Sequence, residues 1–321
     1  MTTSPCRVGI IAASGQILAI LALIVAALLS VATLGVDVFH IYWNKNRLQA
    51  GTDAAALAGA FYAANLHFQA NDSRCTYGTD AQNAACTFAL TNGVALSEIS
   101  SIQFDSVKQT VTVNTTRSVP ALFAKVVGYT QFTVTATATA ALEALGAGDG
   151  ILPIGLDSQT PYTYGQAIVM HVGGCGPGCW QGLALQSYSG GNTGGSVFQQ
   201  NLTLGCDCTV TIGDTATSEP GAKTGPTKKG IDDRISAGLA ADPSGTWNQH
   251  STNDVRAAVV GLVDWNGCNG RCQAPVRGFA EVWITASNGS DIDAIFIQQV
   301  APGRPSPTAP NAGAMHALLT Q

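Results

Sequence analysis

A long uncharged apolar segment near the N-terminus constrains this chain more than any other feature. Residues 17–36 read ILAILALIVAALLSVATLGV, and Arg7 is the only charged residue before Asp37. In a helix, with a rise of about 1.5 Å per residue, about 20 apolar residues match the roughly 30 Å hydrocarbon core of a bilayer. The segment therefore predicts a membrane-spanning helix. The alternatives are a cleaved secretory signal, a buried core helix of a soluble protein, and an anchor with no further role.

The residues after the apolar segment continue the helical pattern. Residues 37–68 contain no proline and are rich in alanine, a strong helix former. Apolar residues recur at a loosely helical spacing, at Ile41, Leu48, Ala55, Leu57 and Phe61. We therefore expect one long helix, or two nearly collinear helices, over residues 12–68. Its first half would lie in lipid and its second half in water, with Gly35 and Gly51 as bend points.

The polar residues along this helix resemble a known family. The sequence SGQILAILAL at 14–23, followed by GVDVFHIYWNKNRLQAGTDAAALAGA at 35–60, resembles the N-terminal segment of TadG-like proteins. These proteins belong to the tight-adherence (Tad/Flp) pilus-assembly systems of bacteria. The residues that carry the resemblance are Gly15, Gln16, Asp37, Leu48, Gln49, Asp53, Ala54, Ala55, Ala56, Leu57, Ala58 and Gly59. One departure is Ser14, where the family often has a basic residue.

This resemblance implies a structural or assembly component of a pilus or secretion machine in the cell envelope, and not an enzyme. The partners that it implies are the lipid bilayer and other pilus proteins. It implies no cofactor, no catalytic residue and no small-molecule substrate. The alternative function is a surface-exposed binding module or adhesin on an ordinary membrane anchor.

Processing of the N-terminus is a further question, because Gly15-Gln16 lies where type IV pilins are cut. The mature helix of those pilins carries a glutamate near its fifth residue. Counted from Gln16, the fifth residue here is Ile20. We therefore expect an uncleaved anchor instead of a polymerising pilin.

The cysteines indicate the compartment. One of the nine, Cys6, precedes the apolar segment, and an even number follows it, as a disulfide framework in an oxidising compartment requires. The eight candidates for disulfides are Cys75, Cys86, Cys175, Cys179, Cys206, Cys208, Cys268 and Cys272. We expect a single-pass protein of the bacterial inner membrane, with a cytoplasmic N-terminus and the bulk of the chain outside. The few basic residues near the span point weakly the other way.

Other site chemistries have weaker support. The close cysteine pairs could instead bind zinc or an iron–sulfur cluster. A calcium site could use acidic residues, although no Asp-x-Asp-x-Asp-Gly run is present. These acidic residues are Asp207, Asp214, Glu219, Asp232, Asp233, Asp291 and Asp293. The histidines have no recognised catalytic spacing, with His250 beside Trp247 and Asp254 the nearest approach to a constellation. We therefore expect neither a metal site nor an enzyme. The net charge of -5 suggests no nucleic-acid partner.

The fold class that we predict is α+β. A single transmembrane helix continues into a pilin-like stalk helix, followed by a small α+β unit and a larger, mostly-β domain braced by disulfides. The expected segments are a cytoplasmic tip (1–11), the helix (12–68), the α+β unit (69–145), a glycine-rich hinge (146–150), the Cys/Gly-rich domain (151–301) and a flexible tail (302–321). Turn residues and alternating apolar positions define the elements.

In the small unit we expect a helix from residue 81 to Asn92-Gly93, strands at 102–104, 110–114 and 132–138, and a helix at 119–128. In the larger domain we expect strands at 167–172, 183–187, 209–212, 255–263, 276–285 and 291–300, and a helix at 231–242.

Asp37, which ends the apolar segment, has two interpretations. It either marks the edge of the hydrocarbon and faces water, or contacts a neighbouring helix. Lys45 is too far along the same helix to be its partner, at about 12 Å of helix rise. A partner would therefore come from another chain.

Overall fold

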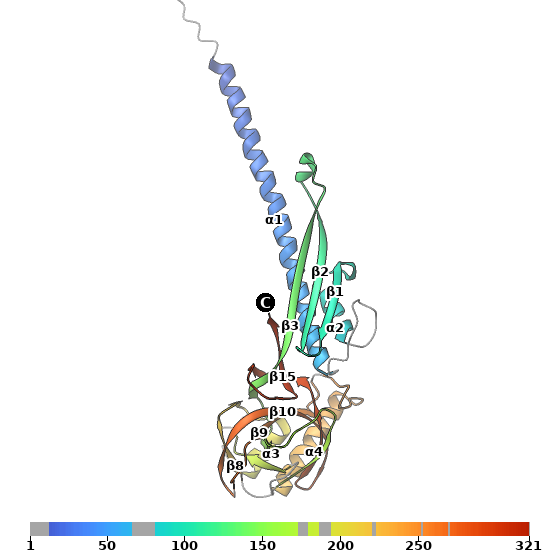
Figure 1. Cartoon of the computed structure of the whole chain (residues 1–321), viewed down its shortest axis with the longest axis vertical. Helices are drawn as coiled ribbons and strands as arrows, with labels where there is room; N and C mark the ends of the chain where they lie inside the picture. Colours follow the sequence, from blue (N-terminus) through green and yellow to red (C-terminus); the bar gives the residue numbers. More distant parts are fainter. Residues whose placement is uncertain are drawn as a thin grey trace, which may run out of the picture.

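The computed structural model describes residues 13–65, 81–172, 179–185, 194–219, 223–251, 253–268 and 270–320. One long helix, α1 (Ala13–Asn65), projects from a body that contains two β-sheets and further helices (Figure 1). The α+β class predicted from the sequence is confirmed.

Helix α1 runs through 53 residues without interruption at Gly35 or Gly51, so the prediction of one long helix holds. Its C-terminal half packs against the first sheet and against α2 (Ala81–Thr91). Its N-terminal half extends beyond the body (Figure 1). The sequence explains why only the C-terminal half of α1 packs on the body. Small and apolar residues alternate with polar ones only after Asp37.

The first sheet has the strand order β1-β2-β3-β15-β12. The short strands β7 (Thr209–Thr211) and β13 (Gly303–Pro305) also pair with β3. The five strands of this order are β1 (Ile99–Asp105), β2 (Thr110–Pro120), β3 (Gln131–Asp149), β15 (Ala314–Thr320) and β12 (Gln299–Val300). Alternate residues of β2 and β3, such as Val111, Val113, Val134 and Ala136, are buried in one core with α1. Their neighbours are mostly threonines, so the sheet has the period-two pattern of one covered face and one polar face.

The β2–β3 hairpin ends in a short 3₁₀ helix, η2 (Ala124–Val127), which Gly128 closes in a left-handed conformation with φ 94°. The helix predicted at 119–128 is therefore too long. Val119 and Pro120 are paired with β3 as strand residues. These residues adopt the strand conformation and not the helix because the strand buries Val119, whose side chain is 1% exposed.

Strand β3 is 19 residues long and joins the two halves of the body. We expected a flexible hinge at 146–150, but in the structure β3 continues as a strand to Asp149. A Cβ atom on Gly146 would approach Ser306 Cβ to 2.5 Å, and one on Gly148 would approach Ile151 Cγ2 to 2.9 Å. These glycines therefore allow neighbouring chain segments to pack closely. From the sequence pattern alone, the same glycines indicate a flexible segment.

The second sheet forms a closed ring, because β10 pairs with both β9 and β11. Around the ring the order is β10-β11-β5-β6-β4-β9. Strand β14 (Asn311–Ala312) pairs with β10, and β8 (Thr215–Glu219) pairs with β10 and β6. The ring strands are β4 (Ile154–Asp157), β5 (Ala167–Val172), β6 (Cys179–Leu183), β9 (Ala257–Val263), β10 (Gln273–Asn288) and β11 (Asp291–Ile297). Both faces of β9 are buried, with Val260 and Val263 in different cores.

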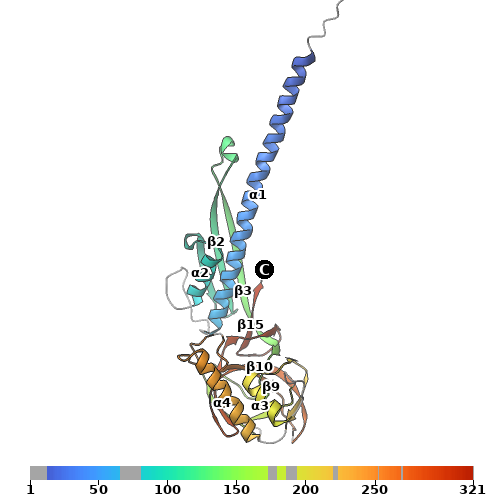
Figure 2. The same ribbon diagram turned by 180° about the vertical axis from the view of Figure 1, so that it is seen from behind.

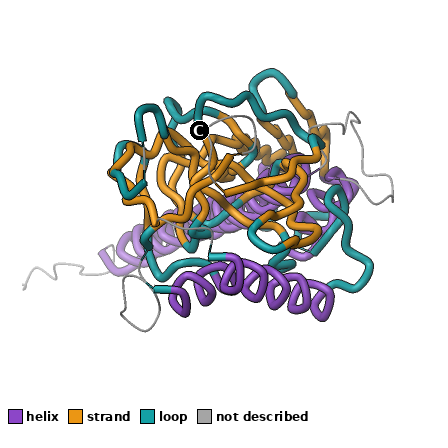
Figure 3. Tube along the Cα trace, turned by 90° about the horizontal axis from the view of Figure 1, so that it is seen from below, coloured by secondary structure: helices purple, strands orange, loops and turns teal. Residues whose placement is uncertain are grey.

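Helices α3 (Gly195–Leu204) and α4 (Thr224–Ala241) pack on one of these cores through Phe198, Leu202 and Ile231. In Figure 3 one helix lies along the lower edge of the strands, and other helical turns are seen behind them. The short strands β7 (Thr209–Thr211) and β8 (Thr215–Glu219) complete this half. The sequence patterns predicted β5, β7 and β9–β11 well. They placed β6 too late, started α4 seven residues too late, and missed β4, α3 and β8.

The C-terminal residues form strands β13 (Gly303–Pro305), β14 (Asn311–Ala312) and β15. The expectation of a flexible tail over 302–321 is therefore wrong for residues 303–320, apart from short connections. Strand β15 pairs antiparallel with β3, and Met315 is buried in the core beside α1. The last strand thus returns from the second half of the body to the first.

Candidate functional site on the N-terminal helix

The projecting half of α1 has an unusual surface. Every leucine, isoleucine and valine from Ile17 to Val36 is at least 45% exposed. Among the described residues, α1 is the one helix long and apolar enough to cross a membrane. An exposed apolar surface of this size on all sides of a helix is costly in water and favourable in lipid.

Asp37 ends this surface and is only 3% exposed. Its carboxylate accepts hydrogen bonds from the backbone N–H groups of Leu122 (2.8 Å), Phe123 (3.0 Å to Oδ2, 3.2 Å to Oδ1) and Ala124 (2.6 Å to Oδ2). These N–H groups stand at the start of η2, where a helical turn leaves backbone donors without acceptors. The carboxylate therefore fixes the tip of the β2–β3 hairpin against α1.

This contact corrects both sequence interpretations of Asp37. The residue does not face water, and its partner lies in the same chain, more than 80 residues further on. Sequence reasoning searched for a basic side chain or a second helix. The donors are backbone N–H groups, which leave no residue-type signal.

Polar residues in and beside the TadG-like motif connect α1 to the first sheet. The Gln49 side-chain amide donates to Asp53 Oδ1 at 2.7 Å and to the Thr137 carbonyl at 3.0 Å. One turn further, the buried hydroxyls of Thr52 and Thr115 lie 2.7 Å apart. Both contacts hold the helix in a fixed register along the strands.

Small residues of the same motif let the helix approach closely. Leu48, Ala55, Ala56, Ala58 and Gly59 are buried, and Ala54 and Leu57 are partly buried. A Cβ atom on Gly59 would lie 3.0 Å from Val111 Cγ1 and 3.3 Å from Ala85 Cβ, so the glycine fits between the sheet and α2. The motif therefore has a packing role in the half of α1 that lies on the body.

The remaining motif residues, Gly15 and Gln16, lie within α1, and their side chains are outside the described part. Between the apolar half and the packed half, Trp43 and Tyr42 are exposed, and the Arg47 guanidinium lies 5.1 Å from the Trp43 ring centroid. Aromatic residues with a polar edge are typical of the membrane–water interface.

Four of the eight candidate cysteines form two disulfides in the structure. Cys206 bonds to Cys208 and Cys268 to Cys272, with Cα–Cα distances of 5.2 and 5.7 Å. Cys86 is also disulfide-bonded. Cys75 and Cys175 lie outside the described residues, and Cys179 begins β6. Within the described ranges, no group of three or more His, Cys, Asp or Glu residues is arranged to hold a metal.

The acidic residues considered for calcium have other partners or stand apart. Asp232 and Asp233 bind Lys228 and Lys229 one turn earlier in α4, and Glu219 binds Lys223. His250 does not form a constellation with Asp254: its Nε2 lies 2.6 Å from Gln299 Oε1, and Asp254 forms a buried ion pair with Arg256.

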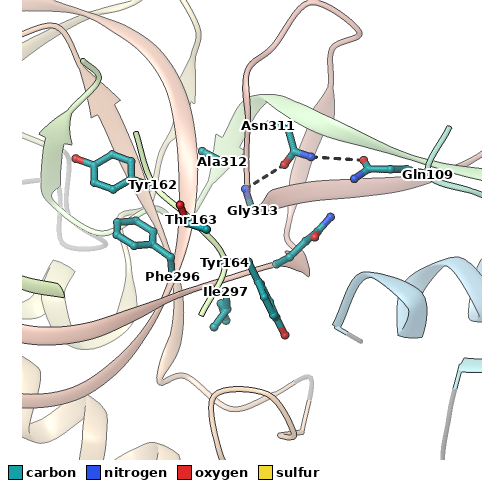
Figure 4. Close-up of a pocket in the computed structure, with 10 residues that line it drawn as sticks. Gln109, Tyr162, Thr163, Tyr164, Phe296, Ile297, Asn311, Ala312 and Gly313 are labelled. Carbon is teal, nitrogen blue, oxygen red and sulfur yellow. Dashed lines mark hydrogen bonds between the residues drawn. The ribbon is translucent and has the colours of Figure 1, made fainter. Parts of the chain in front are cut away.

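One pocket of about 250 Å³ lies where the two halves of the body meet. Figure 4 shows it between Gln109, in the turn after β1, and residues of the second sheet. The Asn311 amide donates to Gln109 Oε1 at 3.5 Å, and the rings of Tyr162 and Phe296 lie 4.3 Å apart. The described residues that line it carry aromatic, amide, hydroxyl and aliphatic groups, and none of them is charged. Sequence reasoning found no signal for this pocket, because its residues come from distant segments.

Comparison with known proteins gives a family match for the N-terminal helix. Residues 15–64 match the Tad family model, described as Flp pilus-assembly TadE/G-like. The match confirms the resemblance of the N-terminal segment and supports involvement in Tad/Flp pilus assembly. It covers nearly all of α1 and ends before α2. No curated protein and no solved structure gives a significant match to the chain.

Proposed function

We propose that this protein is a membrane-anchored structural or assembly component of a Tad/Flp-type pilus or secretion apparatus. The observation that carries the proposal is the exposed apolar half of α1, within a segment that matches the pilus-assembly family. No other part of the described chain covers this surface. A role as a non-enzymatic anchor or scaffold agrees with a helix whose polar residues serve attachment and packing.

The proposed location is the bacterial inner membrane, with one span and a cytoplasmic N-terminus. Disulfides after α1 support an oxidising compartment for the body. The apolar half of α1 would cross the bilayer, and Tyr42 and Trp43 would lie at its outer interface.

The fold gives this anchor a rigid connection to the body. The same helix that leaves the membrane is packed against the first sheet and α2, and Asp37 fixes the hairpin tip at the point of exit. A movement of the membrane half of α1 therefore moves the body with it. Such a rigid connection suits a component that holds other proteins in place during assembly. The partners that we propose are other pilus proteins, contacted through this anchored body or within the membrane.

Membrane anchoring is tested by replacing Leu23 and Leu28 with arginine in the full-length protein. Each arginine in the middle of a span costs about 3 kcal/mol of insertion free energy. We expect the wild type to stay in the membrane pellet after carbonate extraction and the double variant to be released. The matched control is Leu239→Arg, because Leu239 is 46% exposed on α4 and far from the apolar half in sequence.

The pilus role is tested separately, by exchanging residues 17–36 for an unrelated apolar helix. We expect this variant to remain in the membrane. If the native helix contacts pilus proteins, the exchange lowers piliation or co-purification with pilus components. Membrane retention of the wild type with no associated pilus protein in cells that assemble pili would contradict the function but not the anchor.

A second candidate function is a binding module on the same anchor, and the pocket of Figure 4 favours it. Its uncharged amides and aromatic rings suit a small neutral ligand. Under this alternative, Tyr162→Ala lowers surface adhesion of cells while pilus assembly stays normal. A change in piliation without a change in adhesion would favour the assembly role.

A further inference from the structure

The tip of the β2–β3 hairpin has an apolar surface that the fold leaves uncovered. Its exposed side chains are Leu122 (48%), Phe123 (45%), Val126 (90%), Val127 (73%) and Tyr129 (62%). Lys125 is the one charged residue between Ala121 and Thr130. A protruding turn with this composition is costly in water, and an all-polar turn would close the hairpin equally well.

The position of the tip relative to α1 indicates what could cover this apolar surface. Its backbone is bound by Asp37, the residue at which the apolar run of α1 ends. Figures 1 and 2 show the hairpin running along α1 toward the projecting half of the helix. The tip therefore reaches the level at which the helix would leave the hydrocarbon, beside the exposed Val38 and Phe39.

We propose that the hairpin tip, residues Leu122 to Tyr129, is a second membrane contact that inserts into the interface of the leaflet where α1 emerges. The inference rests on the proposed membrane anchoring of α1. Val126 and Val127 enter the acyl boundary, Tyr129 lies at headgroup level, and the Lys125 ammonium faces lipid phosphates.

The apolar surface of the tip is continuous with that of the membrane-spanning half of α1, which indicates that lipid covers both. The apolar surface of the tip and the apolar surface of α1 meet at Asp37, so the medium that covers one extends to the other. One span alone leaves the body free to rotate about the membrane normal and to tilt. A second contact to one side of the helix removes both freedoms and presents the body to partners in one orientation.

The chain contains a matched control position. Val107 is 91% exposed in the turn between β1 and β2, and Val126 is 90% exposed in η2. Strand β2 separates the two turns by 11 residues, about 35 Å in an extended strand. Equal residue types with equal exposure therefore lie at the two ends of the same strand.

The experiment places a trifluoromethyl-phenylalanine at Val107, Val126 or Val31 of the full-length protein, which leaves the native cysteines unchanged. Each labelled protein is reconstituted in nanodiscs of phosphatidylethanolamine and phosphatidylglycerol. Relaxation of the ¹⁹F signal is measured with a nitroxide lipid and, separately, with a water-soluble gadolinium chelate. At Val126 we expect the ratio of lipid to aqueous relaxation to exceed that at Val107 by about tenfold, as for a side chain buried in the interface.

The position Val31, within the apolar run, separates the two hypotheses. If the label at Val31 is not relaxed by the nitroxide lipid, the anchoring proposal itself fails. If Val31 is relaxed but Val126 behaves like Val107, the second membrane contact is wrong. Protection of Val126 from both reagents would assign the tip to a contact with another protein chain and would also overturn the proposal.

Discussion

The Asp37 carboxylate accepts a hydrogen bond from the Ala124 backbone N–H at 2.6 Å, so the residue that ends the apolar run of α1 holds the tip of the β2–β3 hairpin. The contact joins two segments that are 87 positions apart. It is the point where the projecting half of α1 and the folded body become one rigid unit.

Replacement of Asp37 by asparagine is expected to loosen this attachment. Asparagine keeps one acceptor oxygen and turns an amide donor toward the other N–H groups, so buried donors lose their acceptor at a cost of about 1–3 kcal/mol. We expect faster hydrogen exchange at the amides of residues 122–124 with membrane insertion unchanged. Asp53→Asn serves as control, because Asp53 receives a side-chain bond only from Gln49 among the contacts of the described residues. Unchanged protection in Asp37→Asn would show that the carboxylate is not needed to hold the tip.

Two glycines of α1 are expected to respond oppositely to alanine. A Cβ atom on Gly51 would overlap Val94 Cγ2 and lie 3.3 Å from the Asn92 carbonyl oxygen, whereas one on Gly35 meets nothing within 4 Å. Gly51→Ala should therefore destabilise by about 1–3 kcal/mol through overpacking. Gly35→Ala should be neutral or stabilise by up to about 1 kcal/mol through helix propensity.

Thermal unfolding in detergent micelles measures both glycine variants. The double variant Gly51→Ala with Val94→Ala removes the overlapping methyl groups and should recover part of the loss. Equal melting temperatures for Gly51→Ala and the wild type would show that the helix can shift away from the turn after α2.

The difference between these glycines also shows what the sequence could predict. The sequence predicted one long helix with an exposed half, because the uncharged, mainly apolar segment 17–36 and the alanine-rich residues after it favour a helix locally. Strand β5 was found correctly for the same reason, since its apolar, β-branched run decides its conformation. The sequence could not show which glycine is packed, because Val94 and Asn92 approach Gly51 only through the tertiary fold.

Long-range pairing explains the larger errors. Residues 146–149 (GAGD) read as a hinge because glycine and alanine carry no strand signal of their own, and residues 314–320 read as part of a tail because they follow the proline-rich residues 302–313. They are strands because the end of β3 pairs with β7 and β13, and β15 pairs with the preceding part of β3. The contact of Asp37 belongs to the same class, since its donors are backbone groups of a distant turn.

The cysteines after α1 are expected to be oxidised, with Cys6 as the one free thiol. The structure contains the Cys206–Cys208 and Cys268–Cys272 disulfides and a bonded Cys86. Thiol counting on denatured protein without reductant should find one reactive thiol, and Cys6→Ser should reduce the count to zero. Five or more free thiols, or stoichiometric zinc, would contradict the disulfide assignment.

The last prediction concerns Glu281 on β10, whose side chain is buried and whose Oε2 has no hydrogen-bond partner in the described part of the chain. Burial raises the pKa of this carboxyl to about 8, against a smaller opposing effect of Arg234. The folded protein therefore keeps a proton that the unfolded chain releases above about pH 4.5, an ordinary value for glutamate. Because the folded state binds more protons in this range, stability falls as the pH rises from about 4.5 to 8, by up to about 1.4 kcal/mol per unit, and levels off above 8.

Glu281→Gln removes this proton equilibrium while it keeps the shape of the side chain. Relative to the wild type, the variant should gain stability steadily between pH 5 and 8, as measured by denaturant unfolding at each pH. Glu98 gives a control of opposite sign. The Arg117 guanidinium, with Nε 2.6 Å from Glu98 Oε1, lowers the pKa of that carboxyl, so its stabilising contribution is present at neutral pH and is lost on acidification. Glu98→Gln should therefore lose stability relative to the wild type at pH 7 and approach it in acid. A constant difference between Glu281→Gln and the wild type across pH 5–8 would show that Glu281 does not hold a proton in the folded protein.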